Sequence, residues 1–394
     1  MKKYLLILLS LGASAIVLAQ DSLCIKLDSL LMAPMFDTSQ VGMMVYDLTD
    51  DKVLFERNAR QTMRPASTMK LLTAATALDH LGSNYQLQTR LFYTGTIENG
   101  KLTGDIYCVG GFDPMVSRDD IRAFAEDIHQ LGVDTLQGGI YADLSMKESL
   151  DYGEGWCWDD KNPKLTPLSV GRDDNFIERL MQAMLLDSIV FQQVQIGECV
   201  CPAEATFLSA CSHSIDQVLL RMMKKSDNFY AEALFYQIAK AISGRRTATA
   251  DDARTAMRYL IRRIGLNDNL YRFADGCGLS LYNYLSAEME TMLLRFVWRN
   301  NYIYSHLYPT LPIAGVDGTL EKRMNKTAAK GNVRAKTGTL TGISSLAGYC
   351  TAANGHQLAF CIINQGVLRG KDGRDFQDRV CKLLCEPWET ITEE

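Results

Sequence analysis

The chain has 394 residues, of which 41 are Lys or Arg and 46 are Asp or Glu, so its net charge at pH 7 is −5. This mildly acidic composition, without long basic runs, argues against nucleic acid or an anionic membrane surface as a partner. The length is sufficient for two or three domains with a sizeable core.

The first predicted element is a secretory signal peptide over residues 1–19. Lys2 and Lys3 form a basic start, an apolar run covers residues 4–18, and residues 17–19 offer small side chains to a signal peptidase. The run is shorter than the roughly 20 apolar residues that a membrane anchor needs. Polar residues follow it. We therefore expect an exported, periplasmic protein without a transmembrane anchor.

Strand patterns and one helix pattern alternate in the first part of the mature chain. A helix rich in Ala and Leu is predicted over residues 65–78, with Pro65 at its start. From about residue 110 to 205, short strands and helices are mixed. Strands are predicted over residues 41–48, 53–56, 86–93 and 102–109.

Helix patterns dominate after residue 213, and a strand pair and a helix close the chain. Asn354-Gly355 between two strand patterns gives a strong hairpin signal. Strands at both ends that enclose helices suggest one α+β domain formed by residues 20–84 and 206–394, with residues 85–205 inserted. The helix patterns cover residues 214–225, 228–242, 251–264 and 375–384, and the hairpin strands cover 344–351 and 357–364.

Eleven cysteines in an exported chain permit disulfides, and the odd number leaves at least one thiol free or paired with another chain. Three of them lie in apolar strand patterns and are predicted to be buried core thiols: Cys108, Cys350 and Cys361. The close pairs Cys199/Cys201 and Cys381/Cys385 match no familiar zinc pattern. We expect disulfides or unreactive thiols at these pairs rather than a metal site.

The first of three short motifs is Ser67-Thr-Met-Lys70, at the start of the helix predicted over residues 65–78. Residues i and i+3 share a helix face, so the hydroxyl and the amine can be neighbours. A serine is activated when an adjacent base takes its proton, and Lys70 can be that base only when it is neutral. Burial and a second cation are the two effects that lower a lysine pKa from about 10.4 towards about 7. Alone, the motif is weak evidence, because a serine cap followed by an exposed lysine is far commoner.

The second motif is Ser226-Asp-Asn228, which lies between two helix patterns. The simpler interpretation is an ordinary N-cap for the following helix. In the functional interpretation, the Ser226 hydroxyl relays a proton, and the Asn228 amide holds Lys70 and the substrate peptide. The two interpretations are compatible.

The third motif is Lys336-Thr-Gly338, followed by Thr339, before the C-terminal strand pair. Gly338 leaves room for a substrate backbone beside the strand. Lys336 supplies a second cation near Lys70 and attracts a terminal carboxylate. Thr337 and Thr339 can donate hydrogen bonds. In isolation, a solvated loop would be the simpler interpretation.

All three motifs occur together in the order described for serine β-lactamases and penicillin-binding proteins. The chain resembles the D-Ala-D-Ala carboxypeptidase/endopeptidase family typified by penicillin-binding protein 4 (peptidase family S13, class C low-molecular-mass type). The resemblance implies an α+β fold: a β-lactamase/transpeptidase-like domain, an antiparallel sheet with helices, that carries a β-rich inserted domain. Supporting segments are residues 109–114, 155–160, 275–280 and 318–320.

The resemblance also implies roles for individual residues. Ser67 would be the acylated nucleophile, with Lys70 as base. Ser226 and Asn228 would relay protons and position groups. The terminal carboxylate would be bound by the third motif, and the backbone N–H groups of Ser67 and Thr339 would form an oxyanion hole. Lys336 completes the catalytic set. The substrate-binding set is Thr337, Gly338, Thr339 and Asp159.

Asp159 matches an acidic position that contacts the free amino end of the stem peptide in relatives, although a solvated loop acid has comparable weight. Two positions depart from the D-G-S-G-L-S-R string usual in relatives: Cys277 replaces the serine, and Leu281 replaces the arginine. In relatives, that arginine is associated with recognition of a side chain of the peptide. The presence of Leu281 therefore leaves open how the end of the substrate distal to the scissile bond is recognised.

The implied function is a serine-type carboxypeptidase or endopeptidase acting on peptidoglycan stem peptides, with β-lactams as covalent inhibitors and with no cofactor or metal. One alternative is a serine β-lactamase, although the E-x-x-L-N string of class A enzymes is absent between Asn228 and Lys336. The other is a non-catalytic cell-wall binding or sensor protein, against which stands the presence of every catalytic residue type.

Overall fold

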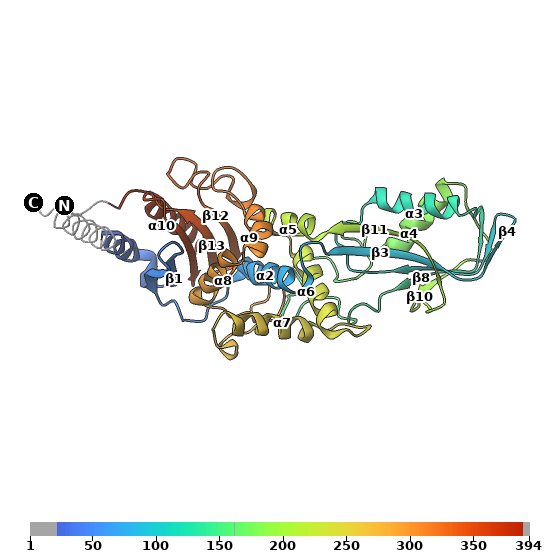
Figure 1. Cartoon of the computed structure of the whole chain (residues 1–394), viewed down its shortest axis with the longest axis horizontal. Coiled ribbons are helices and arrows are strands. Elements are labelled where there is room, and N and C mark those ends of the chain that lie inside the picture. The colour runs from blue at the N-terminus through green and yellow to red at the C-terminus, as the bar shows by residue number, and fades with distance from the viewer. Residues whose placement is uncertain (1–21, 161, 389–394) are drawn as a thin grey trace, which may run out of the picture.

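The structure is a computed structural model that describes residues 22–160 and 162–388. The predicted signal peptide, residues 1–19, lies outside them. The molecule is elongated, with one sheet and its covering helices at one end, a second sheet at the other, and a group of helices between them (Figure 1).

The first sheet joins the two ends of the chain, because its strand order is β12-β13-β14-β1-β2 and every neighbouring pair is antiparallel. Its central strands are buried on both faces, since α10 packs against β13 and α8 packs against β14. The strands are β1 (Gln40–Asp47), β2 (Lys52–Arg57), β12 (Arg334–Leu340), β13 (Ile343–Thr351) and β14 (Gln357–Gln365), and the helices are α8 (Ala287–Arg299) and α10 (Gly370–Cys385).

The helices in the middle of the molecule surround α2. All of its residues from Met69 to Leu78 are buried, and it contacts α5, α6, α7, α8 and α9. Alanine at three of these positions keeps the helix narrow, so that its neighbours can approach closely. The helices are α2 (Met69–Leu81), α5 (Ile215–Lys224), α6 (Asn228–Ser243), α7 (Ala250–Arg263) and α9 (Asn301–Leu307).

The second sheet has the order β10-β8-β6-β3-β11 and mixes parallel with antiparallel pairs. Two helices, α3 and α4, pack on it and on each other around a separate hydrophobic core. The strands are β3 (Gln86–Tyr93), β6 (Ile106–Val109), β8 (Gly139–Asp143), β10 (Gln195–Glu198) and β11 (Thr206–Ser214), and the helices are α3 (Arg118–Gln130) and α4 (Phe176–Leu186).

Short elements complete the fold. A small sheet at the far end has the order β4-β5-β7-β9. Short 3-10 turns connect the larger elements. The strands are β4 (Thr96–Glu98), β5 (Lys101–Thr103), β7 (Thr135–Gln137) and β9 (Val190–Phe191), and the turns are η1 (Pro34–Asp37), η2 (Ala66–Thr68), η3 (Asp268–Leu270), η4 (Tyr308–Thr310) and η5 (Gly318–Leu320).

The sequence located most of these elements but not all of their limits. Because β11 pairs with β3, the second sheet extends to Ser214, beyond the predicted boundary at residue 205. The division into a catalytic part (residues 20–84 and 206–394) and an inserted part stays a prediction. The helices α8 and α9 were not predicted, and α10 begins at Gly370 rather than at residue 375.

Ten of the cysteines, all except Cys24, are free thiols, so no disulfide joins them within the described chain. Cys108, Cys350 and Cys361 are buried, as the strand patterns predicted. Cys381 and Cys385 are also buried, on α10, whereas Cys199 is exposed. Burial raises the pKa of the Cys108 thiol far above its usual value and keeps it protonated.

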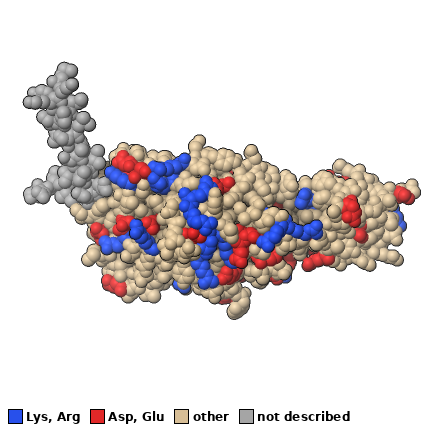
Figure 2. Space-filling view, turned by 60° about the horizontal axis from the view of Figure 1, so that its bottom comes forward, with Lys and Arg blue, Asp and Glu red and all other residues tan. Residues whose placement is uncertain are grey.

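The surface carries both signs of charge. On the face in Figure 2, Lys and Arg lie among Asp and Glu, and no broad area of one sign is visible. Among residues 22–160 and 162–388, no helix combines the length and the apolar character that crossing a bilayer requires.

Candidate active site

Ser67 lies in the 3-10 turn η2, directly before α2, and its side chain is partly exposed. The residue before it, Ala66, has a φ of +51°, in the left-handed region that costs a non-glycine residue about 1–3 kcal/mol. The carbonyl of Pro65 fixes this turn by accepting hydrogen bonds from the hydroxyls of Thr68 at 2.8 Å and Ser345 at 2.5 Å. The sequence therefore holds the serine on a strained turn anchored to the first sheet.

Lys70 lies in the first turn of α2 and has no exposed surface. Its amine is 2.9 Å from Ser67 Oγ, 2.8 Å from Asn228 Oδ1 and 2.7 Å from the carbonyl oxygen of Cys277. A neutral amine has two N–H groups and one lone pair. Since the amide and carbonyl oxygens can only accept, they take the two N–H groups, and the lone pair faces the Ser67 hydroxyl. The arrangement is that of a base positioned for a serine.

Burial lowers the pKa of Lys70, because a charged amine loses its hydration there. The nearby groups Cys277, Asp275, Glu232 and Asp227 act in the opposite direction. Burial also lowers the pKa of Lys336 well below its usual value, and the neighbouring Lys70 lowers it further. For Lys70, therefore, desolvation is the main cause of the shift.

The second motif stands at the N-terminus of α6. Asp227 caps this helix by accepting a hydrogen bond from the Phe229 N–H, so the predicted capping role is present. The buried Asp227 carboxylate also pairs with Arg172 and Arg221, which fixes the turn. Ser226 has a φ of +56°. Its hydroxyl oxygen accepts a hydrogen bond from the Lys336 amine at 2.8 Å. Capping and the Ser226–Lys336 contact thus occur together.

The third motif lies on β12, an edge strand that passes directly beside the serine turn. A Cβ atom at Gly338 would lie 2.1 Å from Ser345 Oγ, 2.7 Å from the Pro65 carbonyl and 2.9 Å from the Ser67 nitrogen. Only glycine allows this approach. Thr339 is exposed, and the Thr337 hydroxyl donates to Thr319 Oγ1 on η5 at 2.8 Å.

A buried loop over residues 275–280 supports Lys70 from behind. Glu232 is four residues after Asn228 on α6, and its Oε1 accepts the Gly276 N–H at 2.9 Å. Asp275 accepts the N–H groups of Gly278 and Ser280, each at 2.7 Å. Since Lys70 contacts the Cys277 carbonyl, the substitution of serine by cysteine leaves that acceptor in place.

Glu232 is fully buried, and burial followed by the charge of Asp275 raises its pKa to about 8. Glu232 is therefore largely protonated at neutral pH. Together with Asp275 and Cys277 it forms a group close enough to hold a metal ion. The carboxylate oxygens in this group, however, already accept N–H groups of the loop, which accounts for their position.

The loop that carries Asp159 is fixed at two points near the site. The indole N–H of Trp156 donates to Asp275 Oδ2 at 2.8 Å, and the Asn228 side-chain amide donates to Asn162 Oδ1 at 3.1 Å. Asp159 lies between these contacts and is exposed. The structure thus brings Ser67, Lys70 and Asn228 into direct contact, joins Ser226 to Lys336, and leaves Asp159 on the loop beside them.

Sequence reasoning missed Asn162, Glu232 and Asp275. The spacing of four residues between Asn228 and Glu232 was a usable signal, because it places both on one helix face. Asp275 lies in residues 275–280, a segment that served only as support for the family resemblance. Nothing in the sequence around Asn162 indicated its contact.

Comparisons with known proteins agree on one family. The family described as "D-Ala-D-Ala carboxypeptidase 3 (S13)" matches residues 23–169 and 161–386. D-alanyl-D-alanine carboxypeptidase DacB of Haemophilus influenzae is 25% identical over 417 residues, covering 84% of this chain and 86% of that protein.

Solved structures give the same result for the fold. Penicillin-binding protein 4 from Haemophilus influenzae has a TM-score of 0.78 at 23% identity, covering 89% of this chain and all of that one. A structure of that protein in complex with a β-lactam has a TM-score of 0.74 at 23% identity, covering 90% of this chain and 97% of that one. The predicted fold class, an α+β transpeptidase-like fold, is confirmed.

Substitution Gly338→Ala should slow acylation of Ser67 by about a hundredfold, because β12 must move away from the serine turn and a shift of about 1 Å suffices for such a loss. The rate of labelling by a fluorescent penicillin measures the effect. Gly197→Ala on β10 is the matched control, since its Cβ would meet only ordinary contacts at 3.7 Å. Equal labelling rates for the two variants would contradict the close approach.

Substitution Glu232→Gln should change the pH profile of acylation. In the wild type, Glu232 loses its proton above about pH 8, and its negative charge then raises the pKa of Lys70 and opposes formation of the neutral base. The glutamine retains an oxygen for the Gly276 N–H but gains no charge. The rise of the acylation rate with pH should therefore be complete at a lower pH in the variant, and superimposable profiles would refute the electrostatic coupling.

Proposed function

The chain belongs to the D-Ala-D-Ala carboxypeptidase 3 (S13) family, and from this membership we propose how it acts as a serine-type D-Ala-D-Ala carboxypeptidase. In this proposal it cleaves peptidoglycan stem peptides, as a carboxypeptidase or endopeptidase, through an acyl-Ser67 intermediate. The observation that carries the mechanism is the fully buried Lys70 amine 2.9 Å from Ser67 Oγ. A buried amine between two fixed acceptors is suited to accept the serine proton.

In the first step, Ser67 Oγ attacks the carbonyl carbon of the scissile D-Ala-D-Ala bond while its proton passes to Lys70. The carbonyl oxygen becomes negatively charged, and the backbone N–H groups of Ser67 and Thr339 are the proposed donors to it. Their nearness is supported by the position of Gly338, whose Cβ would lie 2.9 Å from the Ser67 nitrogen. Such a donor contributes roughly 3–4 kcal/mol in other acyl-transfer enzymes.

In the second step, the C–N bond breaks and the leaving amine takes a proton. The Ser226 hydroxyl, which lies 2.8 Å from the Lys336 amine, is the proposed donor. It regains a proton from the charged Lys70 amine, so Lys70 is neutral again before water attacks. The products are the acyl-enzyme and free D-Ala. Water then attacks the acyl carbonyl, with Lys70 accepting one of its protons, and Ser67 is released with its proton restored.

The terminal carboxylate of the substrate is proposed to bind at β12, near Lys336, Thr337 and Thr339. Because β12 is an edge strand, a peptide can extend the sheet through its backbone. The pKa of Lys336 is lowered in the free protein, and an incoming carboxylate favours the charged amine. Binding of the substrate would thus favour the positive charge on Lys336 that attracts the substrate carboxylate.

Asp159 is proposed to accept a hydrogen bond from an amino group at the other end of the peptide. Its support is the exposed loop position between the anchors Trp156 and Asn162. Leu281 is 41% exposed and its carbonyl accepts the Arg64 Nε–H at 2.9 Å, so this part of the substrate region differs from relatives that carry arginine there. The basic and apolar N-terminal residues support export to the periplasm, which we also propose.

Labelling by a fluorescent penicillin should require Ser67, because a β-lactam presents a strained amide to the same nucleophile. The variant Ser67→Ala should lose labelling entirely. Lys70→Arg should label roughly 10²–10⁴-fold more slowly, since arginine stays charged and cannot act as base. Melting temperatures of both variants control for folding. Persistent labelling of Ser67→Ala would place the nucleophile elsewhere.

Two further results would favour the alternatives. Repeated release of hydrolysed antibiotic, in place of a long-lived adduct, would indicate a β-lactamase. Binding of a pentapeptide without release of D-Ala would indicate a sensor. Release of D-Ala from a pentapeptide, together with a stable penicillin adduct, is the result that the proposal predicts.

A further inference from the structure

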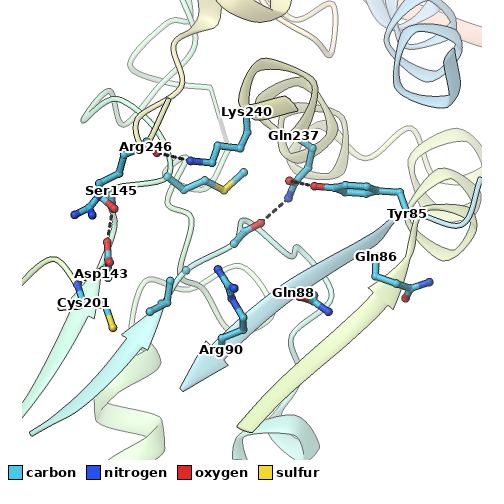
Figure 3. Close-up of a pocket in the computed structure, with 14 residues that line it drawn as sticks. Tyr85, Gln86, Gln88, Arg90, Asp143, Ser145, Cys201, Gln237, Lys240 and Arg246 are labelled. Carbon is cyan, nitrogen blue, oxygen red and sulfur yellow. Dashed lines mark hydrogen bonds between the residues drawn. The ribbon is translucent and has the colours of Figure 1, made fainter. Parts of the chain in front are cut away.

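A second polar pocket lies where α6 meets the second sheet, remote from the serine. It has a volume of about 370 Å³ and is open to solvent on the surface. Figure 3 shows that its walls come from β3, from the end of β8, from α6 and from the turn after α6. Lys240, which lines it, is twelve residues after Asn228, or about 18 Å along the helix axis at 1.5 Å per residue. The pocket is thus separate from the acylation site.

Three cationic side chains line this pocket: Arg90 on β3, Lys240 on α6 and Arg246 after α6. Most arginines of the protein are paired with a carboxylate, but no ion pair links Arg90 or Arg246 to an acid among the described residues. The three cations come from segments far apart in the sequence. The fold therefore gathers positive charge that it does not neutralise.

The single acid in the lining, Asp143, does not offset the three cations. Its Oδ1 accepts the Ser145 N–H at 2.9 Å, and its Oδ2 accepts the Cys201 N–H at 2.8 Å. Asp143 is buried by these contacts and ends β8. With three positive charges and one negative charge, the lining keeps a net positive charge.

Lys240 lies close to the other positive charges of the pocket. Its amine donates to the carbonyl oxygens of Arg245 at 2.6 Å and Arg246 at 2.7 Å, which fixes it at the pocket. Figure 3 draws the contact with Arg246. Burial, and then the charge of Arg246, lower the pKa of Lys240. The charge of Asp143 raises it, and that of Arg90 lowers it further. A bound anion would relieve this repulsion. Neutral hydrogen-bonding side chains on the same strand as Arg90, Gln86 and Gln88, complete a polar surface.

We propose that this pocket binds an oxyanion, a carboxylate or phosphate group, carried by the cell-wall polymer outside the D-Ala-D-Ala segment. The inference rests on the proposed function for the identity of the polymer. Guanidinium groups bind carboxylates and phosphates through charge-assisted hydrogen bonds. A contact about 18 Å along α6 from Asn228 engages an extended polymer but not a short peptide. The pocket therefore favours polymeric over small substrates.

The double variant Arg90→Gln/Arg246→Gln tests the proposal, with Arg374→Gln/Arg379→Gln as matched control. The control removes the same number of charges from α10, which covers the first sheet at one end of the molecule, away from the pocket (Figure 1). Release of D-Ala is measured from a short acyl-D-Ala-D-Ala peptide and from pentapeptide-rich sacculi. The pocket variant should release D-Ala about tenfold more slowly from sacculi, with the short peptide unaffected. The control should match the wild type on both substrates.

Two outcomes overturn the proposal: equal rates on sacculi for the wild type and the pocket variant, or an equal loss on both substrates. Sacculi treated with hydrofluoric acid to remove phosphodiester polymers distinguish the sources. A loss that persists on treated sacculi assigns the pocket to peptide carboxylates, and one that disappears assigns it to phosphate groups.

A calorimetric titration with inorganic phosphate separates this proposal from the proposed function. Salt-dependent binding by the wild type, weakened in the pocket variant, supports the pocket even if no protein releases D-Ala. The opposite result is D-Ala release from the short peptide together with equal phosphate binding and equal rates on sacculi for the wild type and the pocket variant. That result supports the proposed function and refutes the anion-binding role of the pocket.

Discussion

The site depends on one constraint, the burial of the Lys70 amine where water cannot solvate its charge. A lysine in such a place is costly unless its polar atoms are paired. Here three oxygen atoms, from Ser67, Asn228 and Cys277, surround the amine. They come from three separate segments, so the correct base geometry exists only when α2, α6 and the 275–280 loop are packed together. In the proposed mechanism, folding and activation of the serine are thereby linked.

The same linkage explains the strain around Ser67, the proposed nucleophile. The left-handed φ of Ala66 and the close passage of Gly338 are both held by the Pro65 carbonyl, which binds Thr68 and the sheet residue Ser345. The first sheet joins the two ends of the chain, so it fixes a turn near the N-terminus against a strand near the C-terminus. Such rigidity suits the proposed mechanism, in which two hydroxyls and two amines must keep their order through the proton transfers of acylation and deacylation.

The sequence supported the prediction of the motifs and of most strands, because both depend on local spacing. Ser67 and Lys70 share a helix face, and Asn354-Gly355 gives a hairpin. What depends on contacts between distant segments was missed. Examples are the support of Lys70 by the Cys277 carbonyl, the N–H acceptor Glu232, and the pairing of β11 with β3. The pocket at Arg90 and Arg246 is of this kind, since neither residue forms part of a motif.

The most direct test is the pKa of Lys70 itself, measured by NMR of protein labelled at the lysine Cε. The Lys70→Arg variant identifies its resonance, and the wild type retains the native fold. We expect Lys70 to titrate below the ordinary lysine value of 10.5, because its buried charge is unsolvated. A Lys70 that titrates at or above that value, in protein that acylates readily at neutral pH, would contradict its role as the base.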